Sequence, residues 1–142
     1  MKQFLVLLVL SISLTGGKPN DPTKHIYEPE RLKIIKDTET VCGTVVYIRS
    51  EEDGDYHIRL KMNPCSVSLS HKNYTKQDSC IVLEIICEHK SIISNCKCDD
   101  YINKIKVPKI GDKIQAIGQL VFDKRHKWIE IHPVFKINYL NE

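Results

Sequence analysis

The chain has 142 residues, of which 42% are hydrophobic and 27% are charged. This length suits one domain, and the composition is that of an ordinary globular protein, which excludes wholesale disorder and a membrane bundle. The formal net charge is only +3, and basic residues alternate with acidic ones along most of the chain. Typical nucleic-acid-binding domains have a stronger and more clustered positive charge, so the composition gives little support to that class.

Residues 1–17 predict a secretory signal peptide. Lys2 gives a cationic start, an apolar run follows, and small residues end the segment at Gly16 and Gly17. The apolar run is too short to span a bilayer, and no later segment is apolar enough to do so. We therefore expect a secreted, extracellular protein with no transmembrane segment after the signal peptide, and we expect it to be a monomer.

The chain contains six cysteines: Cys42, Cys65, Cys80, Cys87, Cys96 and Cys98. An even number in a secreted chain predicts disulfides, and the sequence alone does not choose the pairing. A bridge from Cys87 to Cys96 or Cys98 would close a short loop, and one from Cys42 to Cys65 or Cys80 would tie early strands together. The alternative is a zinc site made by the last three cysteines with His89, although their spacing is not that of paired Cys-x2-Cys knuckles.

Five segments have the composition and alternation of strands: residues 41–50, 56–63, 80–87, 113–122 and 128–135. Asp53 and Gly54 lie between the first two and tolerate the positive φ of a tight hairpin, and Gly118 predicts a bend or a close backbone approach. Residues 18–39 are expected to form an exposed lead-in and a clasp anchored by Leu32, Ile34 and Ile35. The barrel itself is expected over residues 40–139, with a disulfide-containing insertion between its third and fourth strands.

Several short motifs strengthen this interpretation. They are residues 27–32 (Tyr-x-Pro-x-Arg-Leu), 43–46 (Gly-Thr-Val-Val), 53–58 (Asp-Gly-Asp-Tyr-His-Ile), 84–87 (Glu-Ile-Ile-Cys), 107–112 (Val-Pro-x-x-Gly-Asp) and 128–134 (Trp-Ile-Glu-Ile-His-Pro-Val). Together with the strand order they resemble the OB-fold, an all-β, five-stranded Greek-key barrel. More narrowly, they are similar to a family of small secreted OB-like proteins without an assigned activity. The resemblance covers about residues 25–137 and implies fold and export, whereas the basic tip at residues 125–127 and the extra cysteines depart from the family.

Alternation also predicts which side chains leave the core and form a polar outer face, where Glu84 from the third strand would join them. The candidate ligand-binding residues are His57, Arg59, Lys61, Arg125, Lys127, Trp128, Glu130 and His132. The first hypothesis is a non-enzymatic binding module for a polyanion, a glycan or a protein, because OB-folds bind ligands on this face and on its hairpin loops. The bland alternative is a solvated face with no ligand.

A divalent-metal site is a further hypothesis, with His57, His132 and Asp55 as ligands and Asp53 or Glu130 as substitutes. It would support a metal-assisted hydrolase, the one enzyme class that these residues allow. The sequence contains no Gly-x-Ser-x-Gly elbow, phosphate-cradling glycine loop or His-Glu-x-x-His helix, so a non-enzymatic role is favoured.

The tripeptide Asn73-Tyr-Thr75 is an N-glycosylation sequon. It lies in the polar stretch 66–79, which we interpret as a surface loop. Glycosylation of Asn73 is therefore expected if the secreting cell performs it.

Overall fold

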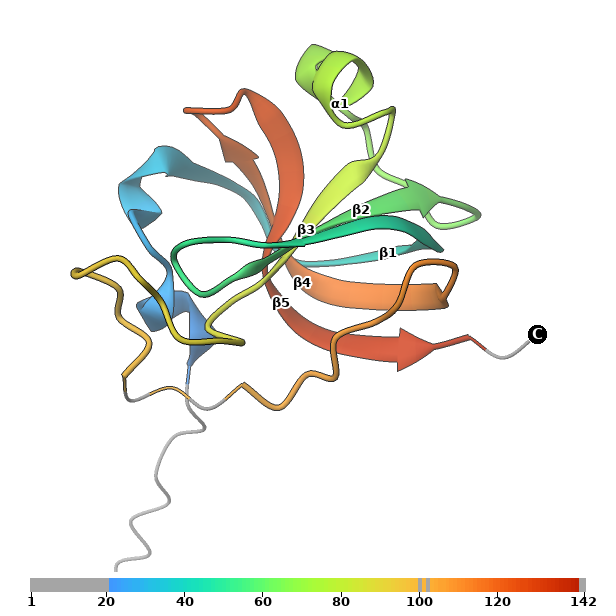
Figure 1. Ribbon diagram of the computed structural model, residues 1–142. Coiled ribbons are helices and arrows are strands. Elements are labelled where there is room, and N and C mark those ends of the chain that lie inside the picture. The colour runs from blue at the N-terminus through green and yellow to red at the C-terminus, as the bar shows by residue number, and fades with distance from the viewer. Residues whose placement is uncertain (1–20, 100, 102, 141–142) are drawn as a thin grey trace, which may run out of the picture.

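The computed structural model describes residues 21–99, 101 and 103–140, so the predicted signal peptide lies outside the described residues. This part of the chain is mostly β, as expected (Figure 1). The elements are, in chain order, the 3-10 helices η1 (Pro22–His25) and η2 (Pro29–Arg31), then β1 (Leu32–Ser50), β2 (Tyr56–Met62), α1 (His71–Lys76), β3 (Ile81–Ile85), β4 (Lys113–Asp123) and β5 (Trp128–Tyr139).

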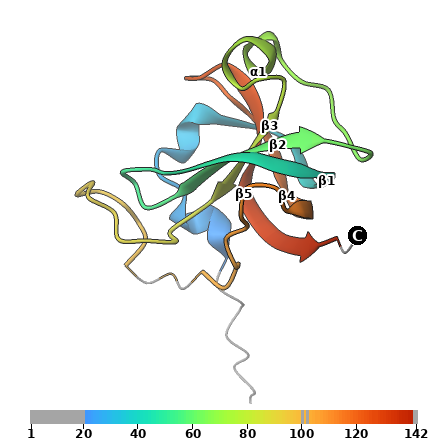
Figure 2. The same ribbon diagram turned by 45° about the vertical axis from the view of Figure 1, so that its right-hand side comes forward.

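The five strands form one sheet that closes into a ring in the order β1, β2, β3, β5, β4, with β4 pairing back to β1. All neighbours are antiparallel except β3 and β5, which pair in parallel over Val82 with Glu130 and Leu83 with Ile131. Figures 1 and 2 show the ring from two sides, with α1 at one end and the loop after β3 at the other. Two strands that are distant in sequence, β3 and β5, therefore contribute side chains to one outer surface.

The interior of the ring is apolar. Its fully buried side chains include Val41, Val45, Ile58, Leu60, Ile81, Leu83, Ile85, Ile114 and Ile131. Each contributes about 1.5–3 kcal/mol relative to an exposed side chain. Every residue of β3 is buried, in agreement with its almost wholly apolar sequence.

The first strand is longer than expected. β1 begins at Leu32, and its first half pairs with β4 through Leu32 with Asp123 and Ile34 with Val121. The prediction of a clasp anchored by Ile34 and Ile35 is wrong, because these side chains are 55% and 50% exposed. Their neighbours are mostly charged or polar, so backbone pairing rather than side-chain burial holds this half-strand. The segment that packs outside the ring is limited to residues 21–31.

The polar stretch after β2 is not simply a loop. Residues His71–Lys76 form α1, which begins with a capping box. The Ser70 side chain accepts from the backbone N–H of Asn73, and the Asn73 side chain accepts from the backbone N–H of Ser70. Asn73 is 0% exposed, and its Nδ2 donates to the carbonyl oxygens of Cys80 at 3.0 Å and Ile129 at 2.9 Å. The prediction of an exposed glycosylation site is wrong, since the atom that would carry the glycan is buried and fully used.

Two disulfides are present, Cys42–Cys65 and Cys87–Cys98, whereas Cys80 and Cys96 are free thiols. Both bridges are among the predicted pairs, and four of the six candidate cysteines are bridged. Cys80 precedes β3, whereas Cys96 lies next to Cys98 beyond the opposite end of that strand. A strand rises about 3.3 Å per residue, which separates the two thiols by far more than a disulfide spans. Disulfides are compatible with the expected secretion.

Gly118 has the predicted role. The register of β4 shifts on both sides of it, and an added Cβ would lie 2.4 Å from the carbonyl oxygen of Pro133. Only glycine allows the backbones of β4 and β5 to approach this closely.

Gly54 should be similarly intolerant of substitution. It has φ +99° in the hairpin between β1 and β2, and an added Cβ would lie 2.6 Å from the carbonyl oxygen of His89. We expect Gly54→Ala to lower the free energy of unfolding by about 2–4 kcal/mol, measured by urea denaturation, because it adds a backbone clash to positive-φ strain. Gly111→Ala is the control, since Gly111 has φ +96° but open space around it. Equal losses for the two variants would contradict the clash.

Candidate functional site

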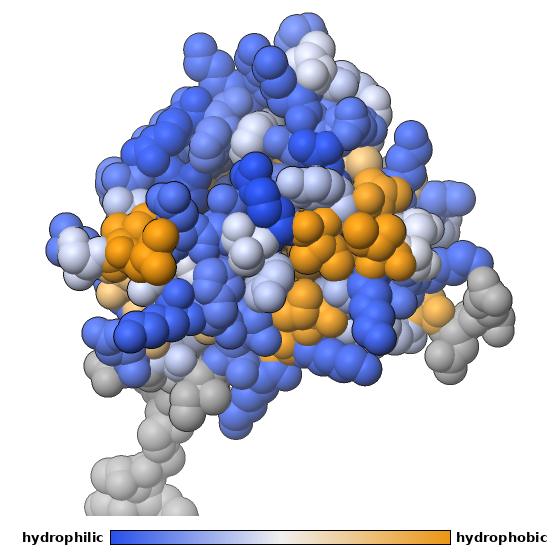
Figure 3. Space-filling view, in the orientation of Figure 1, coloured by the Kyte–Doolittle hydropathy of each residue, from blue (hydrophilic) through white to orange (hydrophobic). Residues whose placement is uncertain are grey.

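A groove of about 580 Å³ lies between α1, the second half of β1, β2 and the hairpin that joins β4 to β5. Its wall consists of Tyr47, Arg49, His57, Arg59, Lys72, Lys76, Gln77, Arg125, His126, Lys127 and Trp128. Six of these residues are arginine or lysine and none is acidic. In Figure 3 the surface around α1, at the top of the view, is almost wholly hydrophilic, and the hydrophobic patches lie lower. The groove is therefore strongly basic, although the net charge of the whole chain is small.

Asn73 fixes the wall formed by α1. Besides its Nδ2 contacts, its Oδ1 accepts from the backbone N–H of Ile129 at 2.8 Å, and the Ser70 hydroxyl donates to the carbonyl of Lys127 at 2.8 Å. These bonds hold α1 against the start of β5. As a result Lys72 and Lys76, which are four residues apart and share one face of the helix, stand beside the hairpin tip.

The cations of the groove fall into two groups. Arg49, Arg59 and Arg125 each pair with a carboxylate outside the wall, on Glu51, Asp78 and Glu28 respectively. Arg59 also donates to Gln77 Oε1 at 2.8 Å and lies 4.5 Å from the centre of the Tyr47 ring. By contrast, no carboxylate pairs with Lys72, Lys76 or Lys127 within the described chain. The lysines are the charges that a ligand can neutralise without breaking an internal ion pair.

Trp128 forms part of the groove and is anchored from below. The His126 ring stacks on it at 4.4 Å, and His57 meets it edge-on at 5.9 Å. Its indole Nε1 donates to Glu130 Oε2 at 2.6 Å. The indole is therefore fixed on one face by an imidazole and at its edge by a carboxylate.

Glu130 and His132 are not on an open face as predicted. They are 1% and 0% exposed. The elements that contact β5 from outside the sheet include η1 and α1. His132 Nδ1 lies 2.9 Å from Glu130 Oε1. Burial alone would lower the pKa of His132, but the hydrogen bond to Glu130 and the charges of Glu130, Glu84 and Asp55 outweigh it and raise the pKa. The two side chains are thus an internal ion pair under the groove, not ligand contacts.

His57 and Glu84 form a second buried pair, with Nδ1 and Oε1 2.9 Å apart. Burial lowers the pKa of His57, and burial together with repulsion from Glu130 raises the pKa of Glu84 well above its ordinary value. Both shifts favour the neutral forms. The other ring nitrogen, His57 Nε2, lies 3.2 Å from Gln77 Oε1, so both nitrogens of the imidazole have a partner.

The predicted metal ligands His57, His132 and Asp55 do not converge. Within the described residues, the group whose ligand atoms come within reach of one ion is Cys87, Cys96 and Cys98. His57 has both ring nitrogens engaged, as described above, and Asp55 Oδ1 accepts from the backbone N–H of Cys87 at 2.8 Å. In the described part of the chain, the structure therefore gives no support to a metal site made by these histidines and carboxylates.

Five of the predicted ligand-binding residues meet in the groove: His57, Arg59, Arg125, Lys127 and Trp128. Lys61 is exposed on β2 but is not part of the wall. The prediction also missed six members: Tyr47, Arg49, Lys72, Lys76, Gln77 and His126. The spacing of Lys72 and Lys76, directly after the capping pair Ser70 and Asn73, is the sequence signal that could have revealed the helical wall.

Comparisons with known proteins do not extend this description: no protein-family model, curated protein or solved structure matches the chain. None of the described helices is both long and apolar enough to cross a membrane.

Asp55 should make stability depend on pH. Burial and the nearby Asp53 carboxylate raise the pKa of Asp55 to about 7, against 3.8 ordinarily. Its contribution to folding is therefore complete below about pH 4 and is lost as the pH rises towards 7. The wild type should therefore lose free energy of unfolding between pH 4 and pH 8. We expect this loss to be smaller by about 2–4 kcal/mol in Asp55→Asn, whose amide oxygen can still accept from the backbone N–H of Cys87.

Urea denaturation at the two pH values measures this difference directly. Asp37→Asn is the matched control, because Asp37 is exposed on β1. If the free energy of unfolding of Asp55→Asn changes with pH as that of the wild type does, titration of Asp55 does not cause the pH dependence.

Proposed function

We propose that this protein is a secreted, non-enzymatic binding module with an OB-fold-like Greek-key barrel, and that its basic groove binds an acidic glycan. The strand order supports the fold assignment, and OB-folds bind ligands on the face of their second and third strands and on the loops that flank it. The groove occupies this region, with β2 as one wall and the β4–β5 hairpin as another. The helix α1, which lies between β2 and β3, adds a third wall.

The observation that carries the proposal is the charge of the groove wall, which contains six cations and no carboxylate. Such a surface attracts anions and repels cations over about a Debye length. Charges on one face add, so a chain with several sulfate or carboxylate groups would bind more tightly than a single small anion.

The aromatic side chains favour a glycan over a single-stranded nucleic acid. Proteins bind single strands by stacking bases on open aromatic faces. Here His126 already stacks on Trp128, and the Arg59 guanidinium covers Tyr47. Anionic groups can still reach the lysines and the outer side of Arg125, which is 55% exposed. Recognition through charge rather than base stacking fits a sulfated or uronic-acid-rich chain.

Trp128 is the single tryptophan of the chain, so its fluorescence reports on the groove. We expect a heparin-derived octasaccharide to change this emission in a saturable way, and we expect the affinity to fall as salt rises from about 50 to about 200 mM. An uncharged oligosaccharide of the same length serves as the control and should have no effect. Unchanged emission and no retention on a heparin column at low salt would overturn the proposal. Tighter binding of a single-stranded DNA of equal charge would overturn the glycan assignment.

A further inference from the structure

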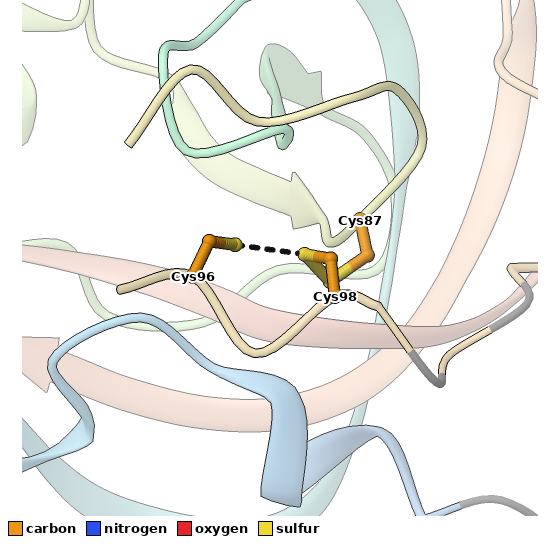
Figure 4. Close-up of side chains that lie close together, drawn as sticks. All are labelled: Cys87, Cys96 and Cys98. Atoms are coloured by element: carbon orange, nitrogen blue, oxygen red, sulfur yellow. Dashed lines mark hydrogen bonds between the residues drawn. A yellow bond between two sulfur atoms is a disulfide. The ribbon is translucent and has the colours of Figure 1, made fainter. Parts of the chain in front are cut away.

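Three cysteines meet in the loop after β3, outside the wall of the basic groove. Cys87, Cys96 and Cys98 have sulfur atoms within 4.8 Å of one another (Figure 4). The three residues line a hollow of about 280 Å³. Cys87 and Cys98 form a disulfide, and Cys96 is a half-buried free thiol. None of the three belongs to the groove wall, so this site is independent of the proposed function.

The free thiol lies directly beside the bridge. Cys96 Sγ is 2.9 Å from Cys98 Sγ and 2.9 Å from the carbonyl oxygen of Asp53. Cys98 Sγ carries no hydrogen because it is part of the disulfide, and the single Cys96 S–H can donate to the Asp53 carbonyl oxygen while its sulfur stays in contact with Cys98 Sγ. The potential nucleophile is thus already positioned at the sulfur that it would attack.

We propose that Cys87, Cys96 and Cys98 form a thiol–disulfide exchange site with two alternative bridges. The Cys96 thiol loses its proton to solvent, and the thiolate attacks Cys98 Sγ. The new Cys96–Cys98 bond forms as the Cys87–Cys98 bond breaks, and Cys87 leaves as a thiolate that takes up a proton from solvent. One disulfide and one thiol are present before and after the exchange, so no external oxidant or reductant is required.

The loop that carries Cys96 is tied to the β1–β2 hairpin at its start and through Cys96 itself, whose Sγ contacts the Asp53 carbonyl oxygen. Backbone bonds from Glu88 and His89 to Gly54, and from Ile92 to Glu52, tie the start of the loop to the β1–β2 hairpin. The chain bends at Lys97, between the two cysteines that would be joined. Exchange would free the end of β3 from the loop while the hydrogen bonds to the hairpin remain.

Cys80 provides an internal comparison. It is also a free thiol, but it is 1% exposed and has no disulfide beside it, and burial raises the pKa of its thiol. A buried thiol of this kind is unreactive. If Cys96 reacts and Cys80 does not, the reactivity comes from the position of Cys96 beside the disulfide and is not shared by every free thiol of the chain.

Tryptic mapping distinguishes the two bridges, because cleavage after Lys90, Lys97 and Lys104 puts Cys96 and Cys98 on different peptides, 91–97 and 98–104. The experiment uses the Cys80→Ser variant, so that peptide 77–90 contains Cys87 as its one cysteine. This protein is incubated without reductant, alkylated under acid quench and digested without reduction. We expect both 77–90 and 91–97 to be found linked to 98–104. The rate at which the second linkage appears should rise by up to about tenfold from pH 6 to pH 7, because only the thiolate attacks.

A Cys87→Ser variant exposed to oxidised glutathione should form the Cys96–Cys98 bridge, whereas Cys96→Ser should retain Cys87–Cys98 alone. The proposal is overturned if prolonged incubation of the protein yields only the Cys87–Cys98 linkage with Cys96 fully alkylated. It is equally overturned if the purified protein carries stoichiometric zinc on these three sulfurs, which would make the group a metal site.

Discussion

Replacing Asn73 by Asp is expected to lower the free energy of unfolding by about 3–5 kcal/mol, the largest loss of any single substitution considered. The change is nearly isosteric, but it removes the two donors that satisfy the carbonyl oxygens of Cys80 and Ile129. It also places a carboxylate against those oxygens in a fully buried position. Denaturation by urea or heat measures the loss.

Asn138→Asp is the matched control. Its Nδ2 makes a single bond to Gln115 Oε1 at 2.9 Å in a half-buried position near the end of β5, so a loss of about 1 kcal/mol or less is expected. A similarly small loss for Asn73→Asp would mean that α1 is not held by this side chain. The same burial predicts that protein secreted from a glycosylating host carries no N-glycan at Asn73, and a mass decrease on enzymatic deglycosylation would contradict it.

Removing the three unpaired lysines of the groove should weaken binding of the sulfated octasaccharide by on the order of 100-fold at low salt. The triple variant is Lys72→Ala, Lys76→Ala and Lys127→Ala, and each lost contact with an anionic group is assigned about 1 kcal/mol. No internal ion pair is broken, so the free energy of unfolding should change little. Fluorescence titration of Trp128 measures the affinity, and urea denaturation checks the fold.

The control is a second triple variant with the same change in net charge: Lys33→Ala, Lys109→Ala and Lys136→Ala. These exposed lysines lie on β1, in the loop before β4 and on β5, and none belongs to the groove wall. A change of about threefold or less is expected, because only the long-range field is altered. If both triple variants lose affinity to the same extent, binding follows net charge and the groove has no special role.

Local sequence patterns predicted much of the fold. β2, β4 and β5 begin where β-branched and aromatic residues start to alternate, and the Asp53-Gly54 turn lies where two such runs meet. The first half of β1 was missed because its side chains are mostly exposed, so no apolar alternation marks it. Backbone pairing with β4 is a long-range event that a local pattern does not encode.

The candidate site was predicted less completely, for a related reason. Alternation indicates only which face a residue lies on, not what covers that face, so it did not reveal that Glu130 and His132 are buried. Both side chains are almost fully buried, although they lie outside the apolar core cluster. Likewise, α1 brings Lys72 and Lys76 to the hairpin through contacts of Asn73 that connect residues 56 positions apart in the sequence.

The most direct test of the central claim is lysine protection by the ligand. The protein is treated with an amine-acetylating reagent with and without saturating sulfated octasaccharide, and acetylation of each lysine is quantified by mass spectrometry. The proposed groove predicts protection of Lys72, Lys76 and Lys127, while Lys33, Lys109 and Lys136 react equally in both samples. Protection confined to lysines outside the groove, or no protection under conditions where the glycan is bound, would contradict the account.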